Sequence, residues 1–388
     1  MIRKVCVFTG SRAEYGLLQP LMKGLKEDHD FQLQLLVSGM HLSPEFGLTF
    51  EQITADGYEI DEKVEMLLSA DTDTAIIKSA GLGMIGYADA LARLMPDMLV
   101  ILGDRFEAFA AATSAYLMKI PIAHLHGGEL TEGASDDALR HAITKMSYYH
   151  FTAAEIYRDR VIQLGESPSR VFNVGAIGLD NIRNLKLLSL AELESSLSIK
   201  LKERLFLVTY HPVTLEHYTA ARQMKCLLAA LDQFPEYQII FTLPNADADG
   251  RIISEMIREY ASERSGRISV FTSLGQLRYL SLIHFVTAVI GNSSSGIIEV
   301  PSMGKPTINI GDRQAGRIHS ATVINCSTDA ESISAAIRSV LEPEFQEWCR
   351  NQSNPYGSGK TAAAILDILK ASGKPDSIKK KFYDLTPQ

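Results

Sequence analysis

Short apolar runs rich in β-branched residues alternate along the chain with longer segments whose apolar positions recur at helical spacing. In the first half the strand-like runs cover residues 5–9, 33–37, 98–102, 120–124, 150–152 and 171–174. The helical segments cover residues 17–25, 74–94, 106–118, 138–146 and 155–164. Runs that are apolar on both faces and separated by helices predict a parallel sheet covered on both sides.

The same alternation restarts in the second half. Strand-like runs cover residues 205–209, 238–241, 268–271, 286–290 and 306–310, with a sixth candidate at 323–325. Helical segments cover residues 215–234, 248–262, 274–282, 296–303 and 330–340. A leucine-rich joint lies near residues 178–194, and the Lys- and Pro-containing tail, residues 372–388, is expected on the surface. The pattern predicts an α/β protein of two doubly wound domains, residues 1–180 and 181–388, whose last helix can pack back on the first domain.

Length and composition agree with this organisation and exclude several classes of protein. A chain of 388 residues is too long for one compact core. Its 38 basic and 46 acidic residues give a net charge of −8 without a Lys/Arg run, which argues against a nucleic-acid partner. The four cysteines lack the spacing of a disulfide framework or a zinc site, which suits a reducing compartment. With no signal-peptide core and no apolar stretch of membrane-spanning length, we expect a cytoplasmic protein without a membrane partner.

Ligands of doubly wound sheets bind at the carboxyl ends of the strands, so the residues after each predicted strand are the candidates for a site. The first strand is followed by residues 9–16, Thr-Gly-Ser-Arg-Ala-Glu-Tyr-Gly. Glycine and serine at a strand-to-helix turn expose backbone N–H groups to an anion, and Arg12 adds a charge suited to phosphate. An ordinary turn with a solvated arginine fits equally well. The pattern is not GxGxxG, which disfavours a dinucleotide cofactor.

Two charged residues, Asp104 and Arg105, come directly after the run at residues 98–102. Charges beyond a buried strand are costly unless they are paired or used. Asp104 is therefore a candidate general acid or base, and Arg105 a candidate phosphate clamp. The alternative is an internal ion pair with Asp104 as the cap of the next helix.

The densest group of ionisable residues follows the run at residues 120–124. Residues 124–129 read His-Leu-His-Gly-Gly-Glu, and residues 136–141 read Asp-Asp-Ala-Leu-Arg-His. If the strand continues, alternation places His124 and His126 on the same side. The glycines admit a substrate, and Arg140 stands one helical turn after Asp136. We favour a functional cluster over a chance grouping. A zinc site is a distant second, because the ligand spacing is not a recognised one.

In the second half, His211 follows the first strand and is either a phosphate donor, an acid or base, or a satisfied buried residue. Asn245 follows the next strand and would suit recognition of a base or ribose. Residues 291–296, Gly-Asn-Ser-Ser-Ser-Gly, combine hydroxyls with the N–H groups of a helix start, an arrangement that suits a diphosphate.

Glu299 stands one turn further and has the reach to accept both ribose hydroxyls, although a plain helix-terminal charge is its alternative role. Arg313 and Arg317 follow the strand-like run at residues 306–310 and suit a phosphate or base clamp, with solvation as the alternative. Taken by themselves, the residues predict a nucleotide diphosphate bound in the second half, with an attached group facing the acid/base cluster of the first half. That arrangement fits a nucleotide-sugar enzyme.

These motifs, in this order, resemble those of the hydrolysing UDP-N-acetylglucosamine 2-epimerases of sialic acid biosynthesis. The resemblance runs from residue 5 to about residue 357, and its matching pieces are residues 10–16, 39–41, 103–105, 126–129, 140–145, 211–212, 291–296 and 308–314. It implies two Rossmann-like domains facing across a cleft in the GT-B manner, with UDP held mainly by the second domain. It also implies a homodimer or homotetramer.

The resemblance further implies roles for individual residues. The positions that match nucleotide contacts of the family are Arg12, Arg105, His211, Asn245, Ser293, Ser294, Glu299 and Arg313, and the matching motifs add Gly16, His41 and Arg140 as substrate-binding residues. The residues expected in proton transfer and leaving-group departure are Asp104, His126, Glu129, Asp136 and His211. Many relatives have Glu at the position of His126, so either His126 or Glu129 takes over that proton-transfer role.

The reaction implied is elimination of UDP from UDP-N-acetylglucosamine to a 2-acetamidoglucal, followed by hydration to N-acetylmannosamine, without a metal or redox cofactor. The main alternative is the same reaction on UDP-2,4-diacetamido-2,4,6-trideoxyglucose, or on a GDP-linked sugar, for legionaminic acid synthesis. A GT-B glycosyltransferase and a non-catalytic nucleotide-sugar binding protein are weaker alternatives.

Overall fold

The computed structural model describes residues 2–70, 72–132, 134–213, 219–244 and 249–385. Contacts divide the chain into two compact units. Unit 1 comprises Met1–Glu129, Asp136–Asn181 and Tyr356–Gln388, and unit 2 comprises Leu130–Ser135 and Ile182–Pro355. Each unit contains one all-parallel sheet with helices, so the predicted fold class is confirmed.

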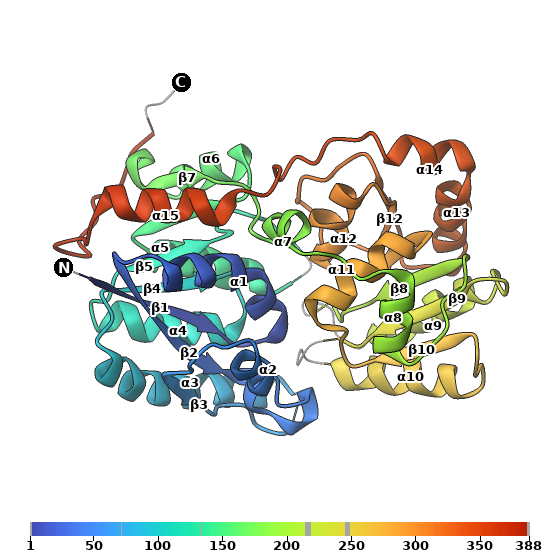
Figure 1. Ribbon diagram of the computed structural model, residues 1–388, viewed down its shortest axis with the longest axis horizontal. Helices are drawn as coiled ribbons and strands as arrows, with labels where there is room; N and C mark the ends of the chain where they lie inside the picture. Colours follow the sequence, from blue (N-terminus) through green and yellow to red (C-terminus); the bar gives the residue numbers. More distant parts are fainter. Residues whose placement is uncertain (1, 71, 133, 214–218, 245–248, 386–388) are drawn as a thin grey trace. The chain divides into compact units, whose positions relative to one another are not determined.

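The sheet of unit 1 has seven strands in the order β3-β2-β1-β4-β5-β6-β7 (Figure 1). Their bounds are β1 Arg3–Thr9, β2 Phe31–Ser38, β3 Glu62–Val64, β4 Met98–Leu102, β5 Ile122–Leu125, β6 Tyr149–Thr152 and β7 Val171–Asn173. Successive side chains of β1 enter opposite layers, because Val5 and Val7 join one hydrophobic core and Cys6 and Phe8 another. Burial on both faces explains why the central strands are apolar throughout.

The helices of unit 1 are α1 Arg12–Glu27, α2 Phe50–Ala55, α3 Asp73–Leu94, α4 Phe106–Leu117, α5 Asp136–Met146, α6 Glu155–Gln163 and α15 Thr361–Ser372, with α7 Gly178–Asn184 at the boundary. Short 3-10 turns occur at Gly39–Leu42, Pro44–Phe46 and Pro168–Arg170. Two helix starts carry side-chain caps, Ser11 on α1 and Thr72 on α3. Such a cap satisfies an N–H that the helix leaves without a partner.

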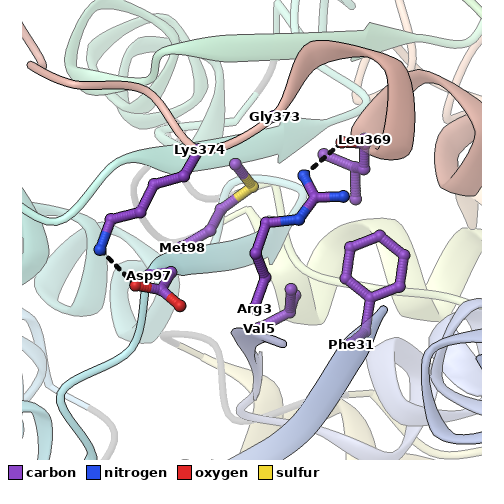
Figure 2. Close-up of a pocket in the computed structure, with 8 residues that line it drawn as sticks. All are labelled: Arg3, Val5, Phe31, Asp97, Met98, Leu369, Gly373 and Lys374. Atoms are coloured by element: carbon purple, nitrogen blue, oxygen red, sulfur yellow. Dashed lines mark hydrogen bonds and ion pairs between the residues drawn. The ribbon is translucent and has the colours of Figure 1, made fainter. Parts of the chain in front are cut away.

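The C-terminal helix α15 is part of the core of unit 1 and lies beside α1 (Figure 1). Its apolar positions Ile365 and Leu369 are buried in the cluster that α1 and β1 share. Figure 2 shows a small pocket where the end of α15 meets the N-terminal ends of the strands. There Arg3 donates to the carbonyl of Leu369 and lies 4.6 Å from the ring centre of Phe31.

The sequence predicted that the tail after α15 lies on the surface, and one of its residues departs from that prediction. Most of its residues are exposed, but the side chain of Lys380 is only 13% exposed and lies 2.8 Å from a carboxylate oxygen of Glu166. Glu166 is buried and also bonds to Lys145 at 2.5 Å and His150 at 3.1 Å. Although burial alone would raise it, these partners lower the pKa of Glu166 to about 2. The ammonium that completes this buried cluster therefore anchors the tail.

The sheet of unit 2 has six strands in the order β10-β9-β8-β11-β12-β13, which repeats the order of the first six strands of unit 1. The strands are β8 Leu205–Thr209, β9 Gln238–Thr242, β10 Ile268–Phe271, β11 Ala288–Gly291, β12 Thr307–Ile310 and β13 Val323–Cys326. The helices are α8 Leu190–Leu197, α9 Ala220–Leu231, α10 Gly250–Ser262, α11 Gly275–Phe285, α12 Ser294–Ile298, α13 Ala330–Leu341 and α14 Pro343–Cys349, with a 3-10 turn at Val300–Met303.

Every strand-like run of the sequence is a strand, with ends shifted by at most two residues. The sequence missed β3, a short edge strand of Glu-Lys-Val, and the helices α2, α7, α8 and α14, and no bounds were predicted for α15. One predicted helix, residues 296–303, is split, because α12 ends at Ile298 and a 3-10 turn with Pro301 near its start, Val300–Met303, follows. The starts of the predicted helices 215–234 and 248–262 lie outside the described residues. Among the described residues, no helix combines the length and apolarity needed to cross a bilayer.

Candidate functional site

Topology gathers the candidate residues of each unit at one edge of its sheet. In unit 1 the strands β1, β4 and β5 are neighbours, and in unit 2 the strands β8, β11 and β12 are separated by no other strand. The chain reverses its winding direction beside β1 and beside β8, and at such a switch point the loops leave a crevice outside the carboxyl ends. The motifs after these strands therefore meet in space within each unit.

The turn after β1 is built around a buried carboxylate. Ser11 accepts the N–H of Glu14, and the Glu14 side chain accepts the N–H of Gly10 at 2.7 Å. Burial, together with the nearby Glu107, raises the pKa of Glu14 to about 7. Arg12 opens α1 and is half-buried, while Gly16 is buried and its carbonyl accepts a hydrogen bond from Asn181 at 2.9 Å.

His41, a predicted substrate-binding residue, is buried with both ring nitrogens in use. Its Nε2 lies 2.9 Å from the hydroxyl of Thr9 and its Nδ1 lies 2.7 Å from the hydroxyl of Thr49. Burial lowers its pKa to about 4. This geometry favours a role in fixing the loop after β2, and contact with substrate remains a prediction.

The two charges after β4 have separate partners. Arg105 lies with its Nε 3.2 Å from a carboxylate oxygen of Glu107, whose side chain is fully buried. Asp104 pairs with Arg140 of α5 instead. The predicted alternative, in which Asp104 caps α4, is wrong, because the N-cap position is Arg105 and no side chain caps that helix. Asp104 thus stays 20% exposed beside a buried guanidinium.

Arg140 is the centre of the cluster that the sequence predicted around β5 and α5. Its side chain is only 1% exposed. It donates to the carbonyl of Glu129 at 2.7 Å, to Asp137 at 3.2 Å and to Asp104. A guanidinium so bound is rigid and permanently charged, so it fixes the orientation of Asp104. Asp136, the first residue of α5, is half-buried at the helix start.

His126 and Glu129 form a second pair in the same turn. Nδ1 of His126 lies 2.7 Å from a carboxylate oxygen of Glu129, which is buried. Nε2 of His126 accepts the N–H of Ile177 at 3.3 Å, so the ring carries its proton on Nδ1 and donates it to Glu129. His126 also has a φ of 65°, a left-handed conformation that is uncommon outside glycine and costs free energy. The turn thus holds the imidazole and the carboxylate as one unit.

In unit 2, Asn292 joins the strand ends, a residue to which the sequence analysis gave no role. It is fully buried. Its side chain accepts the N–H of His211 at 2.7 Å and donates to the His211 carbonyl at 2.8 Å. Its own carbonyl accepts from Arg313 at 3.1 Å and from Gln314 at 2.9 Å. The side-chain amide of Asn292 thus links the turns after β8 and β11, and its backbone carbonyl links the turn after β12.

The glycine before Asn292 cannot be replaced. A Cβ at Gly291 would lie 1.8 Å from the carbonyl oxygen of Thr209, and its φ is 140°. The serines that follow are accessible, since Ser293, which caps α12, and Ser294 are both half-buried. Glu299 is buried at the end of α12, and Asn245 lies outside the described residues.

These arrangements differ in what they can do chemically. Unit 1 presents ionisable side chains held in fixed hydrogen-bonded pairs, which suits proton transfer. Unit 2 presents hydroxyl and amide donors with Arg313, which suits binding of an anion. Within the described ranges, no three His, Cys, Asp or Glu side chains converge as ligands for a metal ion. The residues that sequence reasoning passed over, Glu107, Asn292 and Gln314, act by hydrogen bonds to backbone or to a charged neighbour, and only their position beside the motifs hinted at them.

Residues 23–370 match the protein family described as UDP-N-acetylglucosamine 2-epimerase. The chain is 42% identical over 345 residues to the GDP/UDP-N,N'-diacetylbacillosamine 2-epimerase (hydrolyzing) of Campylobacter jejuni, which covers 89% of each chain. It is 37% identical over 389 residues to the polysialic acid biosynthesis protein P7 of Escherichia coli, which covers 99% of this chain and 98% of that protein.

Among solved structures, the UDP-GlcNAc 2-epimerase of Neisseria meningitidis bound to UDP-GlcNAc superposes with a TM-score of 0.79 at 17% identity. The match covers 95% of this chain and 100% of that one. At this identity the likeness concerns the fold, a pair of parallel-sheet α/β domains of the GT-B-like type.

Proposed function

The chain belongs to the UDP-N-acetylglucosamine 2-epimerase family, and from this premise we propose that it is a hydrolysing 2-epimerase of a nucleotide-linked 2-acetamido sugar. The observation that carries the hydrolysing type is the 42% identity to the Campylobacter jejuni enzyme over nearly the whole chain. The paired acids and bases of unit 1 support it further, because a binding protein or a glycosyltransferase has less use for them.

The reaction proposed has two stages. A base removes the proton on C2 while the C1–O bond breaks, and the nucleoside diphosphate leaves with the electron pair of that bond. Water then adds its hydroxyl to C1 and a proton returns to C2 from the opposite face, which yields the free 2-epimeric sugar. Each positioned acid or base contributes about 10²–10⁴-fold to such a reaction.

We assign the proton transfers to unit 1. Asp104 is held by Arg140 and stays partly exposed, so it can reach a bound sugar. The pair of His126 and Glu129 offers a proton carrier, with Glu129 receiving the Nδ1 hydrogen bond. Asp136 stands at the start of α5, one helical turn before Arg140. The hydrogen bond between His126 and Glu129 supports a shared role for the pair in proton transfer.

We assign the diphosphate to the turns of unit 2. Ser293 and Ser294 supply accessible hydroxyls, and Arg313 and His211 are held beside them through Asn292. Donors fixed before the substrate arrives stabilise the charge that develops on the leaving group at no cost of reorganisation. Arg12 and Arg105 remain proposed phosphate contacts, with Glu299 and Asn245 proposed for the nucleoside.

The preferred sugar is the 2,4-diacetamido-2,4,6-trideoxy one, which the sequence analysis held as the alternative to N-acetylglucosamine. The relative with 42% identity bears that sugar in its name, with either GDP or UDP. UDP-N-acetylglucosamine stays the second candidate, supported by the 37% identity to a polysialic acid biosynthesis protein. The substituents at C4 and C6 distinguish the two donors.

The test is proton NMR of the purified protein in D₂O with three donors in parallel: UDP-N,N'-diacetylbacillosamine, its GDP counterpart and UDP-N-acetylglucosamine. We expect the free 2-epimer with deuterium at C2 and release of the nucleoside diphosphate, fastest with one of the first two. Faster turnover of UDP-N-acetylglucosamine would reverse the substrate assignment. Retention of hydrogen at C2, or no turnover of any donor, would contradict the proposed reaction itself.

The homodimer or homotetramer implied by the resemblance stays a prediction. It is supported by the outer face of α3, where Ile77 and Ile85 are 71% and 68% exposed two helical turns apart. A second copy of the chain is the proposed cover of this face. Light scattering of the purified protein measures the assembly directly.

A further inference from the structure

His124, at the end of β5, is fully buried and has both ring nitrogens engaged. Its Nε2 lies 2.7 Å from the carbonyl oxygen of Gly103, and its Nδ1 lies 3.2 Å from the hydroxyl of Thr144. A carbonyl oxygen can only accept, so Nε2 carries the proton of the ring. Nδ1 is therefore the acceptor and takes the hydroxyl hydrogen of Thr144. The two contacts fix one tautomer and one orientation of the ring.

The ring is neutral over the whole physiological range. Burial lowers the pKa of His124 to about 3. The hydrogen bond to Gly103 and the nearby Asp104 raise this pKa, whereas His150 of β6 and Arg140 of α5 lower it, and the effect of burial is the largest. A ring that does not titrate near neutral pH is not a proton carrier. Its contribution to chemistry has to be geometric.

The two partners of His124 lie next to the residues of the candidate acid/base pair. Gly103 directly precedes Asp104, and its φ of 78° makes the turn that directs the following residue. Thr144 stands one helical turn after Arg140 on α5, so both side chains leave the same face of the helix. Arg140 in turn pairs with Asp104. His124 thus connects the two segments that carry this ion pair, the turn after β4 and the helix α5.

The glycine after His126 packs on the same contact. A Cβ at Gly127 would lie 2.9 Å from the Thr144 hydroxyl and 3.1 Å from Nδ1 of His124. The turn that holds His126 and Glu129 is therefore seated against the hydrogen bond between His124 and Thr144. All three parts of the candidate acid/base cluster, the turns after β4 and β5 and the helix α5, meet at this imidazole.

We propose that His124 is a positioning residue of the elimination step: its hydrogen bonds to Gly103 and Thr144 hold Asp104 at its working distance and angle from the sugar. The inference rests on the proposed function, because it takes Asp104 as a group that transfers a proton. It adds a residue that never touches the substrate and still sets the rate.

The test compares His124→Phe with His124→Gln. Phenylalanine keeps a ring in the site but gives neither hydrogen bond, whereas the glutamine amide can still donate to the Gly103 carbonyl. A small displacement of a reacting group costs on the order of 10²-fold in rate. We therefore expect kcat of the phenylalanine variant to fall by about that factor, with KM and the Kd for the nucleoside diphosphate changed by less than about threefold, and glutamine to restore most of the loss. Thr144→Val should show a smaller loss in kcat that Thr144→Ser repairs.

Three outcomes overturn the proposal. They are an unchanged kcat in His124→Phe, an equal loss in both His124 variants, and a loss of nucleotide binding that parallels the loss in kcat. The first outcome would show that His124 has no effect on the rate. Either of the other two would show that His124 only supports the structure of the site.

A second measurement does not depend on turnover and separates this inference from the proposed function. Nitrogen NMR of the histidine rings should show His124 protonated on Nε2 alone down to about pH 5, and a crystal structure of His124→Phe should show the pair of Asp104 and Arg140 displaced. If the wild-type protein turns over no donor, the proposed function fails while these observations still decide the positioning. An intact pair in the variant structure would overturn the positioning role even in an active enzyme.

Discussion

The two units share one strand order, yet their strand ends carry different chemistry. In unit 1, Asp104 is bound to Arg140, and His126 to Glu129, so ionisable side chains face one another in hydrogen-bonded pairs. In unit 2, the turns are joined by an uncharged amide, Asn292, and lined with serines. Buried charges cost desolvation, and a fold that keeps them gains groups poised for proton transfer. Neutral donors hold an anion at a lower cost. Under the proposed function, the same strand order therefore serves proton transfer in unit 1 and anion binding in unit 2.

The largest effect should come from removing the carboxylate of unit 1. Asp104→Asn keeps the shape and a hydrogen-bond acceptor beside Arg140, but it cannot take up a proton. We expect kcat to fall by about 10²–10⁴-fold, while the Kd for the nucleoside diphosphate, measured by calorimetry, changes little. Asp137→Asn is the matched control, because Asp137 also bonds to Arg140. A large loss of nucleotide affinity in Asp104→Asn would remove the distinction between the units.

The second prediction concerns the effect of pH on unit 1. The pKa of Glu14 rises from 4.5 to about 7 on folding, so the folded state holds this proton more tightly than the unfolded chain. Its contribution to stability is complete below pH 4.5 and is lost as the pH rises to about 7, a change of about 3 kcal/mol.

Urea titrations at several pH values measure the unfolding free energy and test this prediction. Glu14→Gln resembles the protonated side chain, so this variant should lack that part of the pH dependence and exceed the wild type in stability above pH 7. Equal slopes in the two proteins between pH 4.5 and 7 would contradict the assignment.

The third prediction concerns unit 2, where we expect a substitution to lower nucleotide affinity and to leave turnover largely unchanged. Asn292→Ala removes the side-chain amide that holds the backbone of His211, so the turn after β8 loses its link to the turn after β11. We expect the affinity for the nucleoside diphosphate to fall by about 10–100-fold, since each lost buried hydrogen bond costs about 1–3 kcal/mol. Turnover at saturating donor should change far less. Asn325→Ala, an amide on β13 bonded to Asn309, is the control and should leave affinity unchanged.

The smallest expected effect tests whether every buried charge of unit 1 serves catalysis. Lys380 completes the cluster around Glu166 at the tail, away from the strand-end motifs. Because Lys145 and His150 remain as partners, Lys380→Ala should cost about 1.5 kcal/mol and lower the melting temperature by a few degrees without a change in kcat. Lys379→Ala, an exposed neighbour, is the control for scanning calorimetry. A fall in kcat would tie the tail to the chemistry.

Much of the fold could be predicted from the sequence because buried parallel strands leave a strong apolar signal. The strand β8 was predicted with both ends correct, since every residue of Leu205–Thr209 is buried. The strand β3 was missed because Glu62 and Lys63 make it polar at the sheet edge. A last helix that can pack on the first domain was expected, but no bounds were predicted for α15. Its partners could not be identified locally, because Ile365 and Leu369 pack in a core that β1 and α1 supply more than three hundred residues earlier.

The candidate site divides in the same way. Motifs directly after a strand were visible, so Asp104 and the turn at His126 were found. The pairings were not visible, because the partner of Asp104 is Arg140 on another element, and nothing in the local sequence favours it over the adjacent Arg105. Asn292 received no role because it acts on backbone groups, which every residue possesses. His124 was placed in the functional cluster, but its contacts with Gly103 and Thr144 were not visible in the sequence. Such roles can be recognised only once the folded structure shows which strand ends are neighbours.

The place of α15 in the core of unit 1 has a consequence for biosynthesis. Residues 182–355 of unit 2 form one continuous stretch, so nearly all of this unit can fold while the chain is still being made. Unit 1 begins first but needs Ile365 and Leu369 to cover the face of α1 and β1. Its core therefore closes only after α15 has been synthesised. Until then an apolar surface of α1 and β1 stays exposed to solvent, and loss of α15 would destabilise unit 1 more than unit 2.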